Sequence, residues 1–294
     1  MNRILILILS ITFLQVRSQT EVYTSNWITG MMEYNPAVAG KSLDLSAAAI
    51  FRNQWTGFDG APAIQLLQAH KPMLSRRLSY GLGVRSVFAR PVTSVGLDAN
   101  FAYRLRFPSF QVHMGTKLSG TFENNSLTDT QLQELDPAWQ NYQGKKLIPN
   151  VGFGVYVFND NYYIGLSTPR MIRHRNVLGM ESLSWYYLSA GYAETVSNAF
   201  RYRFAFFSGW DTQSPLLLDF NASALFGGKL WVGTHYGTQQ YGLYFQYVIS
   251  PQYYVGYSVD VMNRYNYAML GTSHEITFRY EVSKNRRRVY TYHL

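Results

Sequence analysis

The chain has 294 residues and a formal net charge of +9, but only 15% of its residues are charged and none is cysteine. The lack of cysteine excludes a disulfide scaffold and a lipid-anchored lipoprotein. Basic residues mostly alternate with apolar ones inside predicted strands and form no patch, so we predict no nucleic-acid binding. The 24 Tyr, 18 Phe and 6 Trp suit β-strands and the aromatic girdles of a membrane barrel.

Residues 1–18 have the composition of a signal peptide. Arg3 supplies the charged start, and residues 4–14 form an apolar core that is too short for a transmembrane helix. Val16 and Ser18 give the small-residue spacing for cleavage before Gln19. The alternative is an ordinary N-terminal strand. We predict export, and no later stretch is apolar enough for a helical span.

From residue 43 onward, nearly every segment alternates apolar and polar side chains with a period of two. Val95, Leu97 and Phe101, for example, share one face, and Asp98 and Arg104 share the other. A soluble β-sandwich also alternates, but long segments and polar faces that mix charged with small residues favour a barrel in lipid. We therefore predict an all-β fold, an antiparallel transmembrane β-barrel of outer-membrane type over residues 43–282. It would have about fourteen strands, at residues 43–51, 62–71, 79–90, 92–105, 110–121, 149–158, 161–169, 182–194, 199–208, 214–226, 229–236, 240–249, 252–261 and 271–282.

The predicted connections differ in length between the two ends of the barrel. An exported N-terminus would place the first connection outside the cell, and the outward set then holds the longest loops, as in outer-membrane barrels. The largest, residues 122–148, is polar and carries several acidic residues, so we predict that it is extracellular. After the last strand, residues 283–294 form a basic C-terminal tail or a short edge strand.

No catalytic, cofactor or metal site emerges from the sequence. The six histidines are not spaced three or four residues apart and cysteine is lacking, which argues against a zinc site. Glycine pairs such as Gly152 and Gly154 indicate bends or turns instead of phosphate cradles, because no helix follows them. Charged residues on the polar faces either form cross-strand ion pairs that fill a closed barrel or line a selective pore, and their mixed signs favour ion pairs. These residues are Asp98, Arg104, Lys117, Arg201, Arg203, Asp219, Asp260, Glu275, Arg279 and Glu281.

Residues 35–62 form the most distinctive stretch. Asn35-Pro36 opens a turn, since a residue before proline avoids the helical region. Trp55 suits a membrane interface, and Arg52 offers a fixed fork of donors. We hypothesise that this corner binds a partner at the barrel mouth; the alternative is a rim arginine and a girdle tryptophan that only stabilise the barrel. Residues 19–42 are expected to lie in the periplasm or to plug the barrel. The candidate partner-binding residues are Asn35, Pro36, Gly40, Arg52, Gln54, Trp55, Gly57, Gly60 and Pro62.

Taken together, these motifs resemble the PorP/SprF family. The similarity rests on residues 35–40, on 51–55 with the 57–62 turn, and on three later stretches, 136–139, 147–156 and 163–169. The resemblance implies an outer-membrane β-barrel of the type IX secretion system of Bacteroidota, without enzymatic activity or a cofactor.

The same resemblance implies three kinds of partner. They are the lipid bilayer, the periplasmic and outer-membrane components of the secretion and gliding machinery, and a secreted or surface-anchored protein such as an adhesin. The chain would assist the secretion or surface attachment of that last partner. Two other interpretations stay open, a passive or substrate-selective channel and a membrane-embedded hydrolase with a hydrogen-bonded Ser/His pair.

Overall fold

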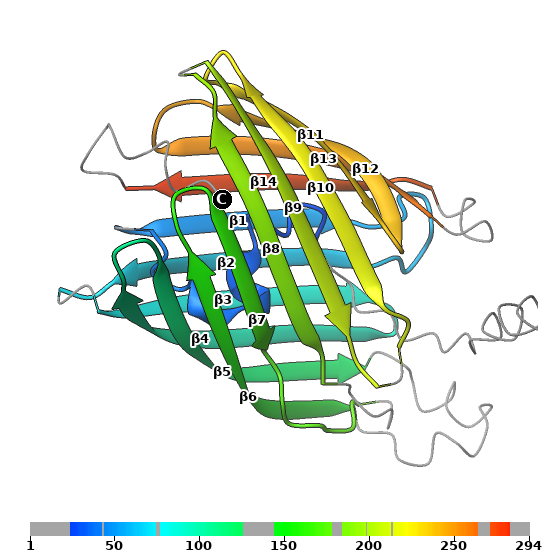
Figure 1. Cartoon of the computed structure of the whole chain (residues 1–294). Coiled ribbons are helices and arrows are strands. Elements are labelled where there is room, and N and C mark those ends of the chain that lie inside the picture. The colour runs from blue at the N-terminus through cyan, green and yellow to red at the C-terminus, as the bar shows by residue number, and fades with distance from the viewer. Residues whose placement is uncertain are drawn as a thin grey trace, which may run out of the picture.

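The computed structural model describes residues 24–42, 44–74, 77–125, 144–177, 184–197, 199–212, 214–263 and 271–282. Within these ranges, fourteen antiparallel strands form one closed sheet in which sequence neighbours pair and β14 returns to β1 (Figure 1). The predicted fourteen-stranded barrel is thereby confirmed. The strands are β1 (Ser46–Asn53), β2 (Ala63–Pro72), β3 (Leu78–Ala89), β4 (Val92–Arg106), β5 (Gln111–Asn125), β6 (Lys145–Phe158), β7 (Tyr162–Thr168), β8 (Tyr186–Thr195), β9 (Phe200–Trp210), β10 (Leu217–Phe226), β11 (Leu230–Gly237), β12 (Gln240–Val248), β13 (Tyr253–Met262) and β14 (Ser273–Glu281).

The barrel closes through a continuous register between its first and last strands. Ser46 of β1 lies opposite Glu281 of β14 at one end of this pair, and Asn53 lies opposite His274 at the other. The other edge of β1 pairs along its whole length with β2. Because lipid offers no hydrogen-bonding partner, a wall that spans a bilayer must satisfy its backbone groups internally, and closure achieves this.

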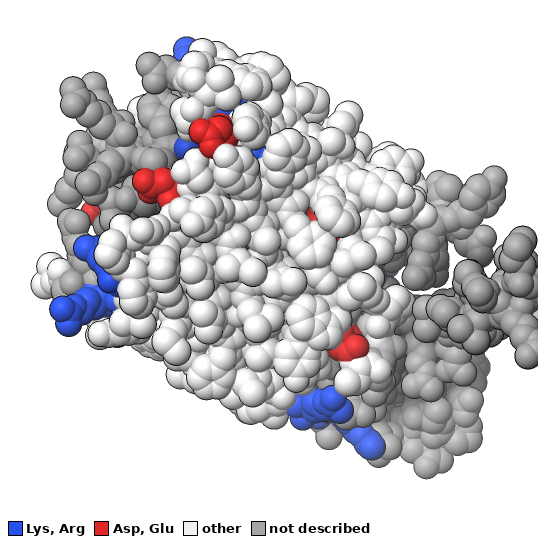
Figure 2. Space-filling model, viewed as in Figure 1, with Lys and Arg blue, Asp and Glu red and all other residues white. Residues whose placement is uncertain are grey.

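Side chains alternate along each strand between the lumen and the outer surface. Phe245 and Phe278 are 45% and 49% exposed on the outer face, whereas the neighbouring Gln246 is 5% exposed. The alternation that the sequence predicts is thereby confirmed at these positions. In Figure 2 a wide uncharged belt covers the visible wall, and the charged side chains gather toward the two ends. The outer face therefore has the apolar character that a lipid contact requires.

The connections divide the barrel into two unlike mouths. At one mouth, which we call the long-loop mouth, β1, β5, β7, β9, β11 and β13 end, and the described residues 54–62, 144, 169–177, 184–185, 263 and 271–272 lie there. At the other, the short-turn mouth, lie the brief connections 107–110, 159–161 and 227–229, and the chain also enters β1 from this side. The connection between β3 and β4, Arg90-Pro91, also lies at the long-loop mouth, although it has only two residues. This asymmetry agrees with the expected difference between outward and inward connections.

Two predicted boundaries were wrong at the largest loop. β5 continues through Asn125 and β6 begins at Lys145, because backbone pairing extends past Thr121 and Ile148 to Asn124 and Lys145. Residues 122–125 and 145–148 are therefore strand and not loop. The rest of this predicted extracellular loop, residues 126–143, lies outside the described residues, as do the predicted signal peptide (1–18) and the basic tail (283–294).

Residues 24–40, which we call the lumen segment, fold inside the barrel (Figure 1). They contain a short α-helix, α2 (Met31–Tyr34), followed by a single 3₁₀ turn, η1 (Pro36–Val38). Neither of these, nor any other helix in the described part of the chain, is long and apolar enough to cross a membrane. η1 packs against β4, β5 and β6, so the segment rests on the inner face of the wall.

The outward position of Phe245 makes a testable prediction. An arginine near the bilayer midplane costs about 2–4 kcal/mol, so Phe245→Arg should lower the yield of folded barrel. Phe245→Leu, which keeps the position apolar, serves as the control. The measurement is the difference in gel migration between unheated and boiled samples. Equal yields from the two variants would show that Phe245 does not face lipid.

A second prediction concerns which mouth faces outside. The chain has no cysteine, so single cysteines report their position without background. Asp59 at the long-loop mouth has a 94% exposed side chain, and Ser109 is exposed at the short-turn mouth. Asp59→Cys should react with a membrane-impermeant maleimide on intact cells, and Ser109→Cys only after lysis. The reverse pattern would invert the proposed orientation.

Candidate functional site

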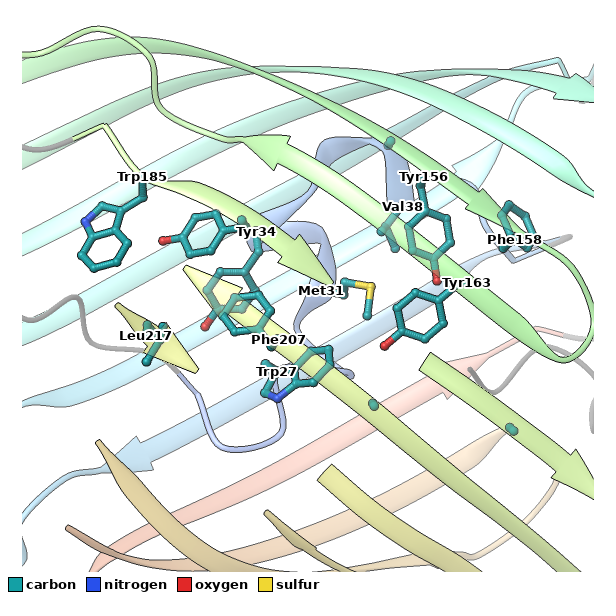
Figure 3. Packing of buried hydrophobic residues seen from close by; sticks show 14 residues of the cluster. Trp27, Met31, Tyr34, Val38, Tyr156, Phe158, Tyr163, Trp185, Phe207 and Leu217 are labelled. Carbon is teal, nitrogen blue, oxygen red and sulfur yellow. The ribbon is translucent and has the colours of Figure 1, made fainter. Parts of the chain in front are cut away.

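The lumen segment is packed against aromatic residues of the wall. Trp27 stacks on Phe207 with ring centroids 5.0 Å apart, and Tyr34 meets the same ring edge-on at 5.0 Å and Tyr187 at 5.4 Å. Aromatic pairs in these arrangements add stability beyond the area that they bury. Figure 3 shows the side chains of the segment directed at the inner wall. The buried cluster comprises Trp27, Met31, Tyr34, Ala37, Val38, Tyr156, Phe158, Tyr163, Trp185, Tyr187, Ala193, Ala205, Phe207 and Leu217.

Asn35 and Pro36 shape the middle of the lumen segment. The Asn35 side-chain oxygen accepts a hydrogen bond from the Ala37 N–H (2.9 Å) and so caps η1. Its amide donates to the carbonyl of Val155 in β6 (3.1 Å). Pro36 stands at the start of η1, where its fixed φ fits the turn and its missing N–H costs nothing. The predicted Asn35-Pro36 turn is therefore a contact between the segment and the wall.

Glycines in the wall make room for the segment. A Cβ on Gly115 of β5 would lie 2.5 Å from the Cα of Ala37, and one on Gly81 of β3 would lie 2.5 Å from the sulfur of Met32. A Cβ on Gly154 of β6 would collide with the side chain of Asn35. Gly81 and Gly154 are not in turns between strands. They lie within strands, where only glycine permits this close approach.

Arg52 lies at the centre of one charged cluster. Its guanidinium contacts the Asp260 carboxylate at 2.5 Å and the Glu275 carboxylate at 3.6 Å, and donates to Gln240 Oε1 at 2.7 Å. The segment joins through Ser25, whose N–H donates to Glu275 Oε2 at 2.8 Å and whose hydroxyl donates to Asp260. All five residues are buried. This Arg52 cluster therefore ties the beginning of the segment to β1, β12, β13 and β14.

The same cluster extends around the wall through a histidine. His235 lies between two carboxylates, with Nδ1 2.9 Å from Asp219 and Nε2 2.7 Å from Asp260. The indole N–H of Trp27 donates to the other oxygen of Asp219 at 3.0 Å. A buried tryptophan needs such an acceptor, so this bond fixes both the depth and the orientation of Trp27.

Glu33 is the centre of a second charged cluster. Its carboxylate lies 3.0 Å from the Lys117 ammonium, 3.4 Å from Arg85 and 2.5 Å from Arg170. Lys117 also contacts Asp98 at 3.1 Å and donates to the carbonyl of Glu33 at 2.8 Å. Three cations thus surround one carboxylate of the lumen segment. Arg170 belongs to the connection between β7 and β8, so this Glu33 cluster links the segment to the long-loop mouth as well as to the wall.

Gly40 ends the segment near the short-turn mouth. Its φ of +74° is one that residues with a side chain rarely adopt. The Gly40 N–H donates to His70 Nδ1 at 3.0 Å, and the Gly40 carbonyl accepts a hydrogen bond from Arg104. His113 accepts from Arg104 at Nε2 (2.9 Å) while its Nδ1 lies 3.1 Å from the Ala37 carbonyl. Because Nε2 accepts from Arg104, the proton of the neutral His113 ring must be on Nδ1, which then donates to the Ala37 carbonyl.

The nine candidate partner-binding residues separate into two places. Asn35, Pro36, Gly40 and Arg52 are buried in the lumen, whereas Gln54, Trp55, Gly57, Gly60 and Pro62 lie in the connection 54–62 at the long-loop mouth. Placing Arg52 at the rim was wrong, because alternation puts it on the lumen face, where it is 1% exposed. Trp55 adopts a φ of 53°, and its N–H donates to Ser273 Oγ at 3.2 Å.

Sequence reasoning found the charges on the wall but missed the residues that meet them. Ser25, Trp27, Glu33 and Tyr34 were not singled out, and neither was Arg170. One signal was available: residues 27–34, with the sequence WITGMMEY, lack strand periodicity and precede strands whose polar faces carry many charges. Eight of the predicted lumen charges are buried, namely Asp98, Arg104, Lys117, Arg201, Arg203, Asp219, Asp260 and Glu275.

Among the described residues, one serine and one histidine come together at a carboxylate of the lumen. No group of three or more potential metal ligands occurs in the described part of the chain. Ser25 and His235 approach the same carboxylate, that of Asp260, but contact different oxygens of it. Neither residue is exposed to a substrate, since both are 1% exposed. The site in this barrel is therefore a set of contacts between the wall and an internal segment.

A closed antiparallel wall with an apolar outer belt and a charged inner face defines an outer-membrane β-barrel. The chain belongs to the PorP/SprF family of type IX secretion system membrane proteins, whose model matches residues 16–280. The family and the fold together place the protein in the outer membrane. No curated protein matches the sequence.

Solved structures with similar folds are outer-membrane barrels of low sequence identity. Omp33 of Acinetobacter baumannii has a TM-score of 0.51 at 10% identity, covering 83% of this chain and 100% of its own. The toluene transporter TbuX of Ralstonia pickettii has a TM-score of 0.52 at 11% identity, covering 87% and 94%. CymD, a monoaromatic hydrocarbon channel, has a TM-score of 0.50 at 13% identity, covering 90% and 95%. At these identities the likeness concerns the fold alone.

The Arg52 cluster makes a prediction about stability. Removing one partner of a buried ion pair typically costs about 3–5 kcal/mol, because the remaining charge is left uncompensated. Arg52→Ala should therefore lower the free energy of unfolding by roughly that amount, measured by urea titration in lipid vesicles. Arg90→Ala, which removes an exposed pair with Asp59, should leave the titration midpoint near that of the wild type. Similar shifts for both variants would contradict the structural importance of the cluster.

Proposed function

We propose that this barrel serves the type IX secretion machinery by assisting the secretion or surface attachment of a partner protein such as an adhesin. The observation that carries the proposal is the occupied lumen of a family member: residues 24–40 lie inside the barrel and pack against its inner wall. A polar cavity of about 50 Å³ lies beside Lys41 and His70. A filled barrel suits an anchor or docking platform better than a route for passive diffusion.

In this proposal the partner binds at the long-loop mouth, at the connection 54–62. Phe58 is 54% exposed there, and Gly57 has a φ of +103° with no atom near the position of a Cβ. A backbone hydrogen bond fixes this connection to the residue before β14, since the Thr56 N–H donates to the Thr272 carbonyl at 2.8 Å. An exposed aromatic on a fixed turn is typical of a protein contact. In this proposal, the binding surface also includes the other candidate residues of the connection, namely Gln54, Trp55, Gly57, Gly60 and Pro62.

The test compares two exposed phenylalanines at opposite mouths. Phe58→Ala should reduce the amount of partner protein on the cell surface while the folded barrel stays at wild-type abundance. Phe107→Ala is the matched control, because Phe107 is 47% exposed in the connection 107–110 at the short-turn mouth. Surface proteins are released from intact cells by protease and quantified by mass spectrometry, with a gene deletion as reference. An unchanged surface profile in the deletion strain would refute the proposed role.

The periplasmic secretion and gliding components are the second class of partner in the proposal. They would meet the short-turn mouth, where residues 107–110, 159–161 and 227–229 are presented. No catalytic step belongs to this proposed function, which the match to a family of secretion-system membrane proteins supports.

A further inference from the structure

We propose that the lumen segment is a releasable plug, so that the barrel is a closed pore that opens to small hydrophilic solutes when residues 24–40 leave the wall. This activity is separate from the assistance of a secreted partner. Three features support it: the backbone pairing of the wall excludes the segment, two buried ion pairs lie within the wall, and side-chain contacts hold the segment in place.

The wall does not depend on the segment for its backbone pairing. Every strand from β1 to β14 pairs with two other strands, and residues 24–40 contribute none of them. Closure is completed by β1 and β14. A segment that is not part of the sheet can leave without exposing an unpaired edge to lipid.

Two buried ion pairs lie within the wall itself and remain when the segment is removed. Lys117 contacts Asp98 at 3.1 Å, and both belong to the wall. Arg52 contacts Asp260 at 2.5 Å, again within the wall. Release of the segment separates Glu33 from Lys117, Arg85 and Arg170, but Lys117 keeps Asp98 and Arg52 keeps Asp260 as an anion of the wall. An emptied lumen would carry paired charges of both signs, which suits passage of small hydrophilic solutes with little ion selectivity.

The apolar contacts make the closed state the resting one. Trp27, Met31 and Tyr34 are 0%, 3% and 5% exposed against the wall, and their release would return this surface to water at a free-energy cost. Hydrogen bonds to Asp219 and Glu275 add to the attachment. The plug is thus held at its beginning, at Glu33 and at Gly40, and it should open only when these contacts are displaced.

The wall glycines give a way to displace the plug without changing a charge. Gly115→Ala would place a Cβ 2.5 Å from the Ala37 Cα, a backbone atom that cannot turn aside. Gly96→Ala is the matched control on the neighbouring strand β4. It also faces the lumen, but its added Cβ would meet only the Thr121 hydroxyl at 3.4 Å and the Arg85 carbonyl at 3.9 Å.

The experiment measures the conductance of full-length protein in planar bilayers with potassium chloride. Heat-modifiable migration on gels first establishes that each barrel is folded. Wild type and Gly96→Ala should stay near the baseline, and Gly115→Ala should show discrete conductance steps. A folded Gly115→Ala barrel that stays at the baseline would overturn the proposal, and so would a wild type that conducts as well as Gly115→Ala.

A second measurement keeps the test decisive if Gly115→Ala fails to fold. Ser167 of β7 is 6% exposed and donates to the Tyr34 carbonyl at 2.9 Å, so it lies beneath the plug. In Ser167→Cys, a small charged thiosulfonate should react at urea concentrations below those that unfold the barrel. Reaction only together with loss of heat-modifiable migration would show that the segment is a fixed part of the core. Neither result depends on the level of any surface partner.

Discussion

The structure depends on one constraint: a chain that crosses a bilayer as strands must pair every backbone group with another strand. The register between β1 and β14 meets this constraint by joining the two ends of the sheet. Closure then fixes the parity of every strand, because a shift by one residue would move each side chain to the opposite face. In this register Arg52 points inward and Phe51 points outward.

Closure creates an interior that must be filled or hydrated. Here it is filled by the chain's own N-terminal segment, and the fit is achieved with glycine on the wall side and with charge on both sides. Gly81, Gly115 and Gly154 let the segment approach the strands. Glu33 pairs with Lys117 of the wall, and the Ser25 N–H donates to the Glu275 carboxylate of the wall. Buried ionic groups of this kind are costly unless paired, so they also fix where the segment can sit.

The two proposed activities use opposite parts of this arrangement. Partner binding would use the fixed turn at residues 54–62, which projects from the long-loop mouth and is tied to Thr272 near the start of β14. Pore opening would use the contacts inside, at the two charged clusters and the glycines. Arg170 links the two regions, since it lies in a connection at the long-loop mouth and contacts Glu33 of the lumen segment.

The sequence by itself determined the barrel, the number of its strands, the outward positions of Phe245 and Phe278, and the family. These follow from local properties, namely a period of two, turn residues and motifs. Only the tertiary structure decided what the lumen contains. Glu33 meets Lys117, and Ser25 meets Asp260, across separations in sequence that no local pattern encodes. The place of Gly115 beneath Ala37 was decided in the same way, because the segment and the wall come together only in the closed barrel.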